Sequence, residues 1–397
     1  MRRRFAMSRK TGGWTRSVSR KSSAGQSPIR CVDLFAGAGG FSLAAQRVGM
    51  TVVAAVEHDR HACETYRHNI VGDAGPTLYE ADITKLSPNK LVRDCFAEGL
   101  VCDVVLGGPP CQGFSVHRIN DSGKNDPRNT LIHRYFEFVS ALNPRAFLME
   151  NVPGMLWPRH AELLQKFYDE ASSAGYRVYP AVIDARDYGL PQGRRRVFIL
   201  GLRNDVLAND WLPKPTHGNA ADIRRNPHLK PWVACRVVFK RKLRKTDPNN
   251  THMKHSEELL ELFKRTPPNG GSRQDSGRVL PCHKNHDGHR DVYGRIDPKK
   301  PSPTMTTACI NPSKGRFLHP TKNHGITLRH AARLQSFPES FVFKGGLMAG
   351  GAQVGNAVPV KLGQLLLRRL VAILEADSRS RAAGYSFGGL GWLSAAE

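Results

Sequence analysis

The sequence predicts an α/β protein in which a doubly wound sheet carries a second, smaller and loop-rich module. Between residues 29 and 204, short apolar stretches typical of buried strands alternate with stretches of helical periodicity. After about residue 204 the alternation stops, and residues 205–300 contain 20 Lys and Arg against 11 Asp and Glu, with many Pro, Gly, His and Asn. Strands that alternate with helices form a parallel sheet covered on both faces, and such sheets bind ligands at the carboxyl ends of their strands.

Each expected element has its own pattern. Residues 29–35 form an apolar strand, a helix follows through residues 41–45 and ends at Gly49, and the next strand covers 52–56 and ends at Glu57. Further strands are expected at 101–106, 145–149, 177–183 and 196–202, and further helices at 60–69, 88–98, 128–142 and 160–174. Helical periodicity returns at 327–337 and in a last helix at 359–375.

The composition favours a nucleic-acid partner. The 397 residues include 59 Lys and Arg against 34 Asp and Glu, a net charge of +25 that attracts a polyanion. Residues 1–28 contain no acidic residue, so we expect a disordered basic tail there. No apolar run approaches the roughly 18 residues that span a bilayer, and the basic N-terminus lacks the apolar segment of a secretory signal. We therefore expect an intracellular protein without a membrane partner.

The first candidate site lies where the first expected strand ends, in Asp33-Leu34-Phe35-Ala36-Gly37-Ala38-Gly39-Gly40. A strand, a glycine turn and a helix N-terminus together form a nucleotide pocket, although a turn that serves only helix packing is the alternative. The glycine spacing differs from the G-x-G-x-x-G pattern of dinucleotide binders, which favours a smaller adenosine-bearing ligand. Glu57 can accept hydrogen bonds from both ribose hydroxyls, and Asp82, where the third strand should end, can accept one from an adenine amino group.

The second candidate site is the loop Gly107-Gly108-Pro109-Pro110-Cys111-Gln112-Gly113-Phe114-Ser115. It follows the apolar run 104–106, so Cys111 lies at the carboxyl end of a strand. Two glycines and two prolines restrict the loop, which presents the thiol to a cleft rather than to the core. Thiolates are strong nucleophiles. We therefore expect Cys111 to be a nucleophile, whereas the other cysteines among the 8 are expected to be mostly buried and reduced.

Charged side chains mark two further strand ends. Glu150 follows the run 146–149 and can act as an acid where burial favours its protonated form. Arg194 and Arg196 alternate as they enter the strand at 196–202, so they point to the same side, where two guanidiniums suit a phosphate or a base edge. Taken alone, each of these residues also fits a solvated surface position.

Taken together, these motifs closely resemble the DNA cytosine-5 methyltransferase family of the bacterial restriction-modification type. The resemblance covers roughly residues 29–204 and 291–372, and its most specific parts are 33–42, 107–115, 150–152, 192–196 and 355–358. It implies a Rossmann-like, S-adenosylmethionine-dependent methyltransferase domain at 29–204 to which residues 346–375 return. It further implies a target recognition domain and connecting segment at 205–345, with 205–326 as the recognition part, and a flexible tail at 376–397.

The resemblance also implies what the site residues do. S-adenosylmethionine would donate a methyl group to carbon 5 of a cytosine that is flipped out of a specific duplex DNA sequence. Cys111 would bind carbon 6 covalently, Glu150 and Arg196 would hold the cytosine, and Arg194 would support them. The cofactor site would be formed by Phe35, Gly37, Ala38, Gly39, Glu57, His58, Asp82, Ile83, Pro109, Asn356 and Val358. The enzyme would be a cytoplasmic, nucleoid-associated monomer that binds double-stranded DNA. A cognate restriction endonuclease would act on the same DNA site without binding the methyltransferase.

One residue departs from the family pattern, and one cluster lies outside it. His330 stands where the family usually has Glu, a departure that concerns local packing. The cluster consists of Cys282, His283, His286 and His289, with Cys309 beyond them. Its spacing does not match a common zinc finger, so no metal is expected.

Three other functions stay open on the sequence alone. An RNA cytosine-5 methyltransferase could use the same scaffold, but the sizeable basic module favours duplex DNA. A DNA-binding protein without catalysis would not need Cys111 or Glu150. A nicotinamide-dependent oxidoreductase is disfavoured by the glycine spacing and by the Pro-Pro-Cys loop.

Overall fold

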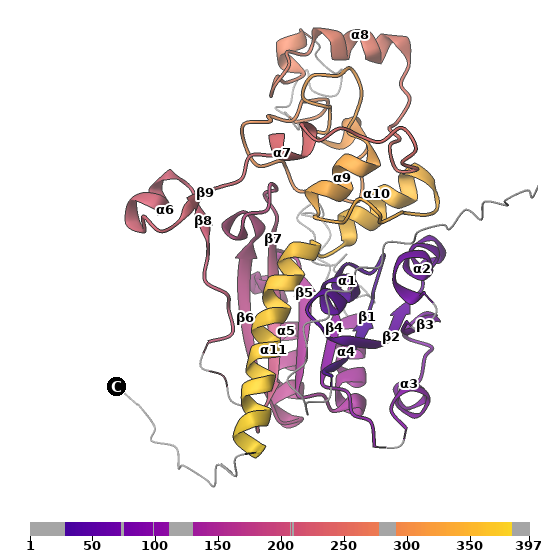
Figure 1. Cartoon of the computed structure of the whole chain (residues 1–397), viewed down its shortest axis with the longest axis vertical. Helices are drawn as coiled ribbons and strands as arrows, with labels where there is room; N and C mark the ends of the chain where they lie inside the picture. The colour runs from indigo at the N-terminus through magenta and orange to yellow at the C-terminus, as the bar shows by residue number, and fades with distance from the viewer. Residues whose placement is uncertain are drawn as a thin grey trace, which may run out of the picture.

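The computed structural model describes residues 28–72, 75–97, 99–110, 130–206, 208, 210–277 and 291–382. Residues 1–27 of the expected tail, Cys111 and the cysteine–histidine stretch 282–289 lie outside the described residues. We call the described parts of 28–206 and 346–382 the sheet domain and those of 210–345 the second module; the second module stands above the sheet domain in Figure 1. No helix in the described ranges is both long and apolar enough to cross a membrane.

The sheet has seven strands in the described chain, in the order β3-β2-β1-β4-β5-β7-β6. Their bounds are β1 Arg30–Leu34, β2 Thr51–Glu57, β3 Thr77–Glu80, β4 Val104–Gly107, β5 Ala146–Asn151, β6 Tyr176–Asp184 and β7 Arg195–Arg203. The first five strands run parallel, whereas β7 is antiparallel to both β5 and β6. The expectation of a wholly parallel sheet is therefore wrong at this edge. Only the ten residues 185–194 separate β6 from β7, and a crossover between parallel strands needs about a dozen or more.

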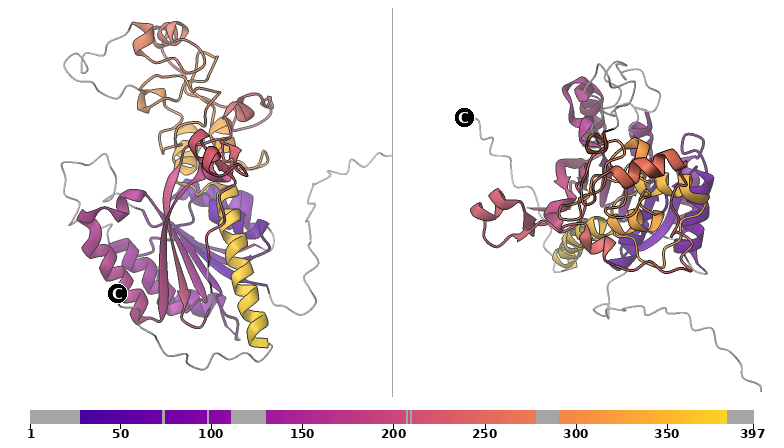
Figure 2. Two further views of the ribbon diagram at one scale, coloured as in Figure 1. Left: turned by 90° about the vertical axis from the view of Figure 1, so that its left-hand side faces the viewer. Right: turned by 90° about the horizontal axis from the view of Figure 1, so that it is seen from above.

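Helices cover both faces of the sheet, as the alternation of patterns predicted (Figure 2). The helices of the sheet domain are α1 Gly40–Arg47, α2 Arg60–Tyr66, α3 Pro88–Cys95, α4 Thr130–Leu142, α5 Ala161–Ser173, α10 Gly346–Asn356 and α11 Val360–Ala382. One face packs against α1 and α11, and the other packs against α3, α4 and α5. The strands supply alternate residues to the two layers, so in β5 Leu148 faces α1 and α11 while Phe147 faces α4 and α5.

The second module consists mainly of loops and short helices, as its composition predicted. Its elements are β8 His217–Gly218, α6 Ala220–Arg225, β9 Lys230–Pro231, α7 Arg236–Phe239, α8 Glu257–Arg265 and α9 Leu328–Leu334. Single 3-10 turns complete the described chain at Pro153–Leu156, Pro158–His160, Ala185–Tyr188, Gln274–Ser276 and Pro312–Lys314. The first three of these turns belong to the sheet domain.

A buried guanidinium organises the second module. Arg295 is 2% exposed and donates hydrogen bonds to carbonyl oxygens on both sides of it. Its partners are the carbonyls of Phe263, Thr266, His319 and Lys322 and the side-chain oxygen of Asn323. Arg295 therefore ties the end of α8 to the loop at 319–323 in a region where few apolar residues are buried together.

An asparagine side chain from each of the two parts holds the segment at residues 342–343. Asn69, in the π-helical turn Arg67–Val71 that continues α2, accepts a hydrogen bond from Val342 N–H at 2.9 Å and donates one to the Val342 carbonyl at 2.8 Å. Asn249 likewise accepts a hydrogen bond from Phe343 N–H at 3.0 Å and donates one to the Phe343 carbonyl at 3.2 Å. Residues 342–343 are thus held from both sides by amide groups that imitate the backbone of a neighbouring strand.

A buried polar network closes the same joint next to β7. Gln192 is fully buried; it accepts a hydrogen bond from Met305 N–H at 2.8 Å and donates one to Gln335 Oε1 at 3.0 Å. Gln335 donates in turn to the carbonyls of Val354 and Ala357, at 2.6 Å and 3.1 Å. The chain therefore returns from the second module to the sheet domain along a path fixed by two glutamine side chains.

The last helix is longer than the sequence predicted. α11 continues to Ala382, so residues 376–382, expected to belong to a flexible tail, are helical. Arg145 donates to the Leu374 carbonyl and pairs with Asp377 at 2.9 Å, and Arg381 pairs with Asp205 at 2.8 Å. These ion pairs with the sheet domain account for the extra turns beyond the predicted end at residue 375.

Replacing the guanidinium of the second module should destabilise the protein. We expect Arg295→Met to lower the free energy of unfolding by about 3 kcal/mol or more, because several buried carbonyl oxygens lose their donors. Urea unfolding followed by circular dichroism measures this change. Lys300→Met is the matched control, since Lys300 is 77% exposed and such surface substitutions change stability by about 0.5 kcal/mol or less. Equal unfolding midpoints for the two variants would show that Arg295 is not an organising residue.

Candidate active site

Four strand ends meet below the second module. β1 ends at Leu34, β2 at Glu57 and β4 at Gly107, while β5 ends at Asn151. Because these strands run parallel, their carboxyl ends lie along one edge of the sheet, the edge that faces the second module in Figure 1. The glycine turn, Glu57, the start of the cysteine loop and Glu150 are therefore brought to the same edge, where doubly wound sheets bind ligands.

The glycine turn between β1 and α1 has an unusual backbone. Phe35 and Gly37 both adopt left-handed conformations, with φ of 55° and 56°, and such a conformation is uncommon for an aromatic residue. A Cβ atom on Gly39 would lie 3.0 Å from the side chains of Tyr66 and Ile70, whereas one on Gly37 would have no neighbour within 4 Å. Gly39 is therefore needed for packing, while the backbone of Gly37 borders open space that a ligand can enter.

Glu57 holds this turn from the neighbouring strand. Its Oε2 accepts a hydrogen bond from Gly37 N–H at 2.8 Å, and its Oε1 accepts from the N–H groups of His58 and Asp59, each at 2.8 Å. Burial opposes ionisation of the carboxyl, but hydrogen bonds from the His58 side chain, Asp59 N–H and Gly37 N–H outweigh burial and hold the pKa of Glu57 below its usual value. Glu57 is thus an anion at neutral pH, and its oxygens keep lone pairs for hydroxyl donors.

A second carboxyl is buried beneath the turn. Asp33 is 1% exposed and accepts hydrogen bonds from Ser42 N–H at 3.0 Å and Ser42 Oγ at 2.6 Å. Ser42 Oγ also shares a hydrogen bond with the Tyr66 hydroxyl at 2.7 Å. Burial raises the pKa of Asp33 to about 7, although the hydrogen bonds from Ser42 act in the opposite direction. Asp33 begins the predicted glycine motif, and the motif alone assigns it no role; the signal that marks it is an acidic residue inside an otherwise apolar strand.

A carboxylate and two guanidiniums meet where β5 ends and β7 begins. Arg196 Nε lies 2.9 Å from Glu150 Oε1, and a terminal nitrogen of Arg194 lies 3.8 Å from the same oxygen. Both arginines therefore point to the same side of the strand, as their alternation predicted. The side chains of Glu150 and Arg196 are 10% and 15% exposed, so their charges are largely shielded from water yet can be reached. This pair can offer a hydrogen-bonding carboxyl and a fixed positive charge to a planar polar ligand.

Arg194 is buried next to this pair rather than exposed to solvent. It is 1% exposed and donates to the carbonyls of Met305 and Gly355, each at 3.1 Å. The side chain instead joins β7 to two segments of the returning chain, and its charge remains close to Glu150. Arg194 is therefore placed to position the pair rather than to bind a ligand itself.

The start of the cysteine loop is fixed beside this pair. The Asn151 side chain donates a hydrogen bond to the Pro109 carbonyl at 3.3 Å, and Pro109 is buried. Asn151 follows Glu150 directly, so one short motif both supplies the carboxyl and holds the loop. Cys111, two residues after Pro109, lies outside the described residues.

The remaining predicted cofactor residues differ in exposure. Asp82 is exposed just after β3, two strands away from β1, and Ile83 is buried in the core beside it. His58 is largely exposed, and its hydrogen bond with Glu57 raises the pKa of its imidazole despite partial burial. Ala38 is buried within the glycine turn.

The chain after α10 packs directly on the glycine turn. A Cβ atom on Gly40 would lie 2.7 Å from the carbonyl oxygen of Val358, so only glycine allows this approach. Asn356 is exposed two residues earlier, at the end of α10. The structure thus places Val358 next to the turn that begins the predicted cofactor site, and Asn356 lies two residues before it in the chain.

His330 replaces the usual glutamate without loss of its local contact. Thr327 N–H donates to His330 Nδ1 at 3.3 Å, and His330 N–H donates to Thr327 Oγ1 at 3.2 Å, which forms a capping box at the start of α9. Burial lowers the pKa of His330 to about 2, so the imidazole is neutral and Nδ1 can accept. A neutral imidazole therefore fills the acceptor role that a glutamate has in this motif.

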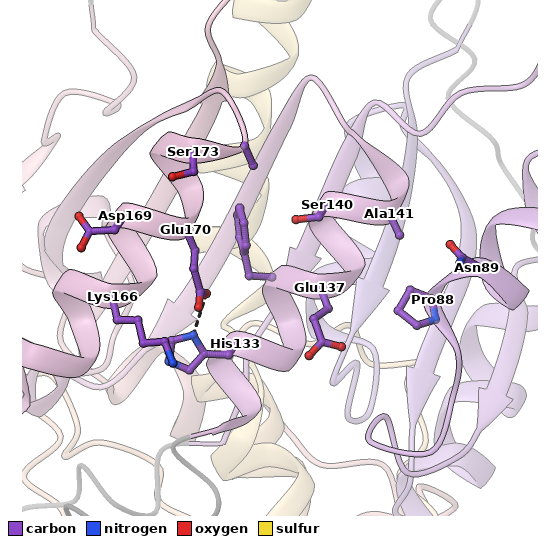
Figure 3. A pocket seen from close by; sticks show the side chains of 12 residues that line it. Pro88, Asn89, His133, Glu137, Ser140, Ala141, Lys166, Asp169, Glu170 and Ser173 are labelled. Atoms are coloured by element: carbon purple, nitrogen blue, oxygen red, sulfur yellow. Dashed lines mark hydrogen bonds and ion pairs between the residues drawn. The ribbon is translucent and has the colours of Figure 1, made fainter.

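A separate groove of about 950 Å³ opens between α4 and α5 (Figure 3). The side chains of His133 and Glu170 meet across it, with Nδ1 2.7 Å from Oε2. The residues that line this groove lie on or next to the helices α3, α4 and α5, and none of them lies in the turn directly after a strand. We therefore place the candidate active site at the sheet edge that carries Glu57 and Glu150, not in the groove.

Comparisons with known proteins identify the family. The C-5 cytosine-specific DNA methylase family matches residues 29–372. The chain is similar to type II methyltransferase M1.HphI of Haemophilus parahaemolyticus, with 33% identity over 342 residues that cover 84% of each chain. It is also similar to type II methyltransferase M.DdeI of Desulfomicrobium norvegicum, with 31% identity over 389 residues that cover 86% of this chain and 88% of the relative.

The fold is also similar to a solved structure. That structure is described as a DNA modification methyltransferase encoded within an E. coli prophage; it has a TM-score of 0.66 and 24% identity, and the match covers 87% of this chain and 99% of the other. At this identity the likeness concerns the fold alone, and it supports the α/β methyltransferase architecture. Because the family match spans most of the sequence, the chain belongs to the C-5 cytosine-specific DNA methylase family and is a DNA cytosine-5 methyltransferase.

Proposed function

We propose that the chain transfers the methyl group of S-adenosylmethionine to carbon 5 of a cytosine flipped out of a specific duplex DNA sequence, through a covalent bond between Cys111 and carbon 6. The observation that carries this proposal is the Glu150–Arg196 pair, which lies at the same sheet edge as the glycine turn and beside the loop that leads to Cys111. A carboxyl and a guanidinium at this spacing can bind the N3 and O2 edge of a cytosine ring.

The residues around the glycine turn fit the cofactor. S-adenosylmethionine would supply an electrophilic methyl group from its sulfonium. Ionised Glu57 can accept from the ribose hydroxyls, and the exposed Asp82 can accept from the adenine amino group. The open space at Gly37 leaves room for a ligand against the backbone, and the contact of Val358 with Gly40 supports the assignment of Asn356, two residues earlier, to the same site.

The remaining site residues activate the base. The Cys111 thiolate adds to carbon 6, and the electron pair of the 5,6 double bond makes carbon 5 an enamine-like nucleophile. The Glu150 carboxyl shares a proton with ring nitrogen 3 and Arg196 binds oxygen 2, so the charge that develops on the ring is neutralised. After carbon 5 has gained the methyl group, loss of its proton and expulsion of the thiolate restore the double bond. The Glu150–Arg196 ion pair must open to admit the base, whereas Arg194 stays bound to two carbonyls and keeps its place.

The two parts of the chain divide the work. Carbon 6 is inaccessible inside a duplex, so the base has to be flipped into the site. We assign methyl transfer to residues 29–204 with 346–375 and sequence recognition to 205–326. Lys240, Arg241, Lys242, Arg244 and Lys245 are exposed, and they are placed to contact phosphates, which position a protein without reading sequence. The type II methyltransferase relatives support a restriction-modification role. We infer a cytoplasmic, monomeric enzyme whose cognate endonuclease acts on the same DNA site.

Cys111→Ser should abolish methyl transfer, since a hydroxyl is a far weaker nucleophile than a thiolate at neutral pH. Tritium transfer to DNA measures the activity, and cofactor binding should survive. Cys95→Ser, on α3, is the matched control and should retain activity. Wild-type protein should also form a stable adduct with duplex DNA that contains 5-fluorocytosine, because fluorine cannot leave as a proton does. Substantial turnover by Cys111→Ser would exclude the covalent route.

Glu57→Gln should weaken S-adenosylmethionine binding by about 10-fold to 100-fold, because charge-assisted hydrogen bonds of about 1.5–3 kcal/mol are lost. Calorimetry of the cofactor-free protein measures the affinity. Glu162→Gln changes an exposed carboxylate in the first turn of α5 and should leave affinity unchanged. Equal affinities for both variants would show that Glu57 does not contact the ribose.

Exchange of residues 205–326 for the matching segment of a relative with another target should transfer that relative's target sequence. The physical reason is that the second module supplies the side chains that reach the bases, whereas the sheet domain supplies the chemistry. Bisulfite sequencing of DNA from cells that express the chimera reads the methylated sites. An active chimera that keeps the original target would contradict this division of labour.

A further inference from the structure

Two large apolar side chains are exposed shortly after the end of β5. Leu156 and Trp157 are each 36% exposed, although Met155, directly before them, is 2% exposed and packs in the layer formed with α4 and α5. Single exposed apolar residues are ordinary on a protein surface, whereas neighbouring ones point to a surface that contacts another molecule.

The chain holds this exposed pair at the sheet edge that carries the candidate active site. The 3-10 turn Pro153–Leu156 packs against β7, the strand that carries Arg196. The second turn, Pro158–His160, follows at once, and each of the two turns begins with a proline. Proline fixes its own φ and restricts the residue before it. The exposed pair is therefore held in a defined position at the edge where Glu150 meets Arg196.

A guanidinium lies over the indole ring of Trp157. The carbon atom Cζ of Arg159 is 4.7 Å from the centre of the ring, and Arg159 Nε donates a hydrogen bond to His160 Nε2 at 3.0 Å. Burial lowers the pKa of His160, and the charge of Arg159 acts in the same direction, so the imidazole is neutral and can accept. The ring contact and the hydrogen bond together orient the guanidinium.

The charge of Arg159 is not balanced by a carboxylate. Among the residues that the structure describes, no Asp or Glu forms an ion pair with Arg159. Arg186 shows the contrast, because it lies over the ring of Trp232 at 4.0 Å but also pairs with Asp184 at 2.6 Å. Arg159 can therefore bind an anion from outside the chain, at a surface whose other part is apolar.

An apolar surface next to an oriented guanidinium matches the chemistry of a nucleic-acid strand. Arginine binds phosphate oxygens, and an aromatic ring packs on a base or a sugar, so neither contact depends on the sequence. When one base leaves the duplex, its neighbour in the same strand loses a stacking partner and exposes a flat apolar face. An exposed indole beside the active site can cover such a face.

We propose, on the basis of the proposed function, that Leu156, Trp157 and Arg159 bind the DNA strand that carries the target cytosine. Leu156 and Trp157 pack against the nucleotide next to the extruded one, and Arg159 binds a phosphate of the same strand. The three side chains stabilise the open form of the duplex and take no part in the methyl transfer itself.

The apolar contact is tested with duplex DNA that carries 2-aminopurine in place of the target cytosine, since this base becomes more fluorescent when it leaves the stack. Trp157→Ala and Leu156→Ala should reduce the fluorescence rise, and Trp157→Ala should weaken DNA binding by about fivefold or more. Trp157→Phe should retain most of both. Leu100→Ala is the matched control, because Leu100 is 45% exposed and lies just before β4, at the opposite edge of the sheet.

The phosphate contact is tested by the salt dependence of DNA binding. Arg159→Gln should lower the slope of log affinity against log salt concentration by about 0.9, because one phosphate contact is lost. Arg159→Lys should keep the slope. Arg93→Gln removes an exposed guanidinium on α3 and should also leave the slope unchanged. Affinity for S-adenosylmethionine and the unfolding midpoint should match the wild-type values in every variant.

Three results would overturn the inference. The first is equal DNA affinity and equal fluorescence for Trp157→Ala and Leu100→Ala, and the second is an unchanged salt slope in Arg159→Gln. The third is a lower kcat with unchanged DNA affinity, which would show that the exposed pair packs against another part of the chain. If the wild-type protein itself gives no fluorescence rise, base extrusion is wrong, and this result is distinct from a normal rise that the variants retain. If Trp157→Ala does not fold, Trp157→Phe and the salt slope of Arg159→Gln decide.

Discussion

Buried hydrogen bonds around Gln192 and Arg194 tie the start of β7 to segments that lie 111 to 161 residues later in the chain. A buried amide and a buried guanidinium carry several donors, and each must find an acceptor. Here the acceptors are backbone carbonyls and the side chain of Gln335, so the positions of the returning segments are determined by two side chains of the sheet domain. The contact between Val358 and the glycine turn, and the placement of Arg196 beside Glu150, both depend on this joint.

The positively charged side chains of the chain are of two kinds, buried arginines and exposed lysines and arginines. Part of the positive charge is internal, because Arg194, Arg295, Arg329 and Arg333 are all buried and donate to backbone carbonyls. Arg333, for example, binds the carbonyls of Arg241 and Lys242, whose own side chains are exposed. A loop with many lysines and arginines is thus held in place by a buried arginine that binds its backbone. The net charge of +25 therefore overstates the charge that faces DNA.

Sequence patterns predicted the strands and helices well where apolar periodicity is strong, as in β1, β2 and α4. They did not predict that β7 runs antiparallel to its neighbours. The direction of β7 depends on the short connection 185–194 between β6 and β7, not on the apolar pattern of the strand. The length of α11 was also missed, since its last turns are stabilised by ion pairs with Arg145 and Asp205, which are remote in sequence. At the site, motifs singled out Glu57 and Glu150, and the resemblance implied a supporting role for Arg194. The burial of Asp33 and Arg194 could not be predicted, because only the folded chain defines it. The capping role of His330 could have been inferred from Thr327 three residues earlier.

The packing of α11 against α1 has a consequence for the order in which the protein can form. The two helices lie at opposite ends of the chain, yet they cover the same face of the sheet. During synthesis the sheet strands and the second module emerge from the ribosome before α11, so the apolar face that α1 shares with α11 is only partly covered until α11 is released. The sheet domain is therefore completed last, and a prematurely ended chain would expose an apolar face to chaperones and proteases.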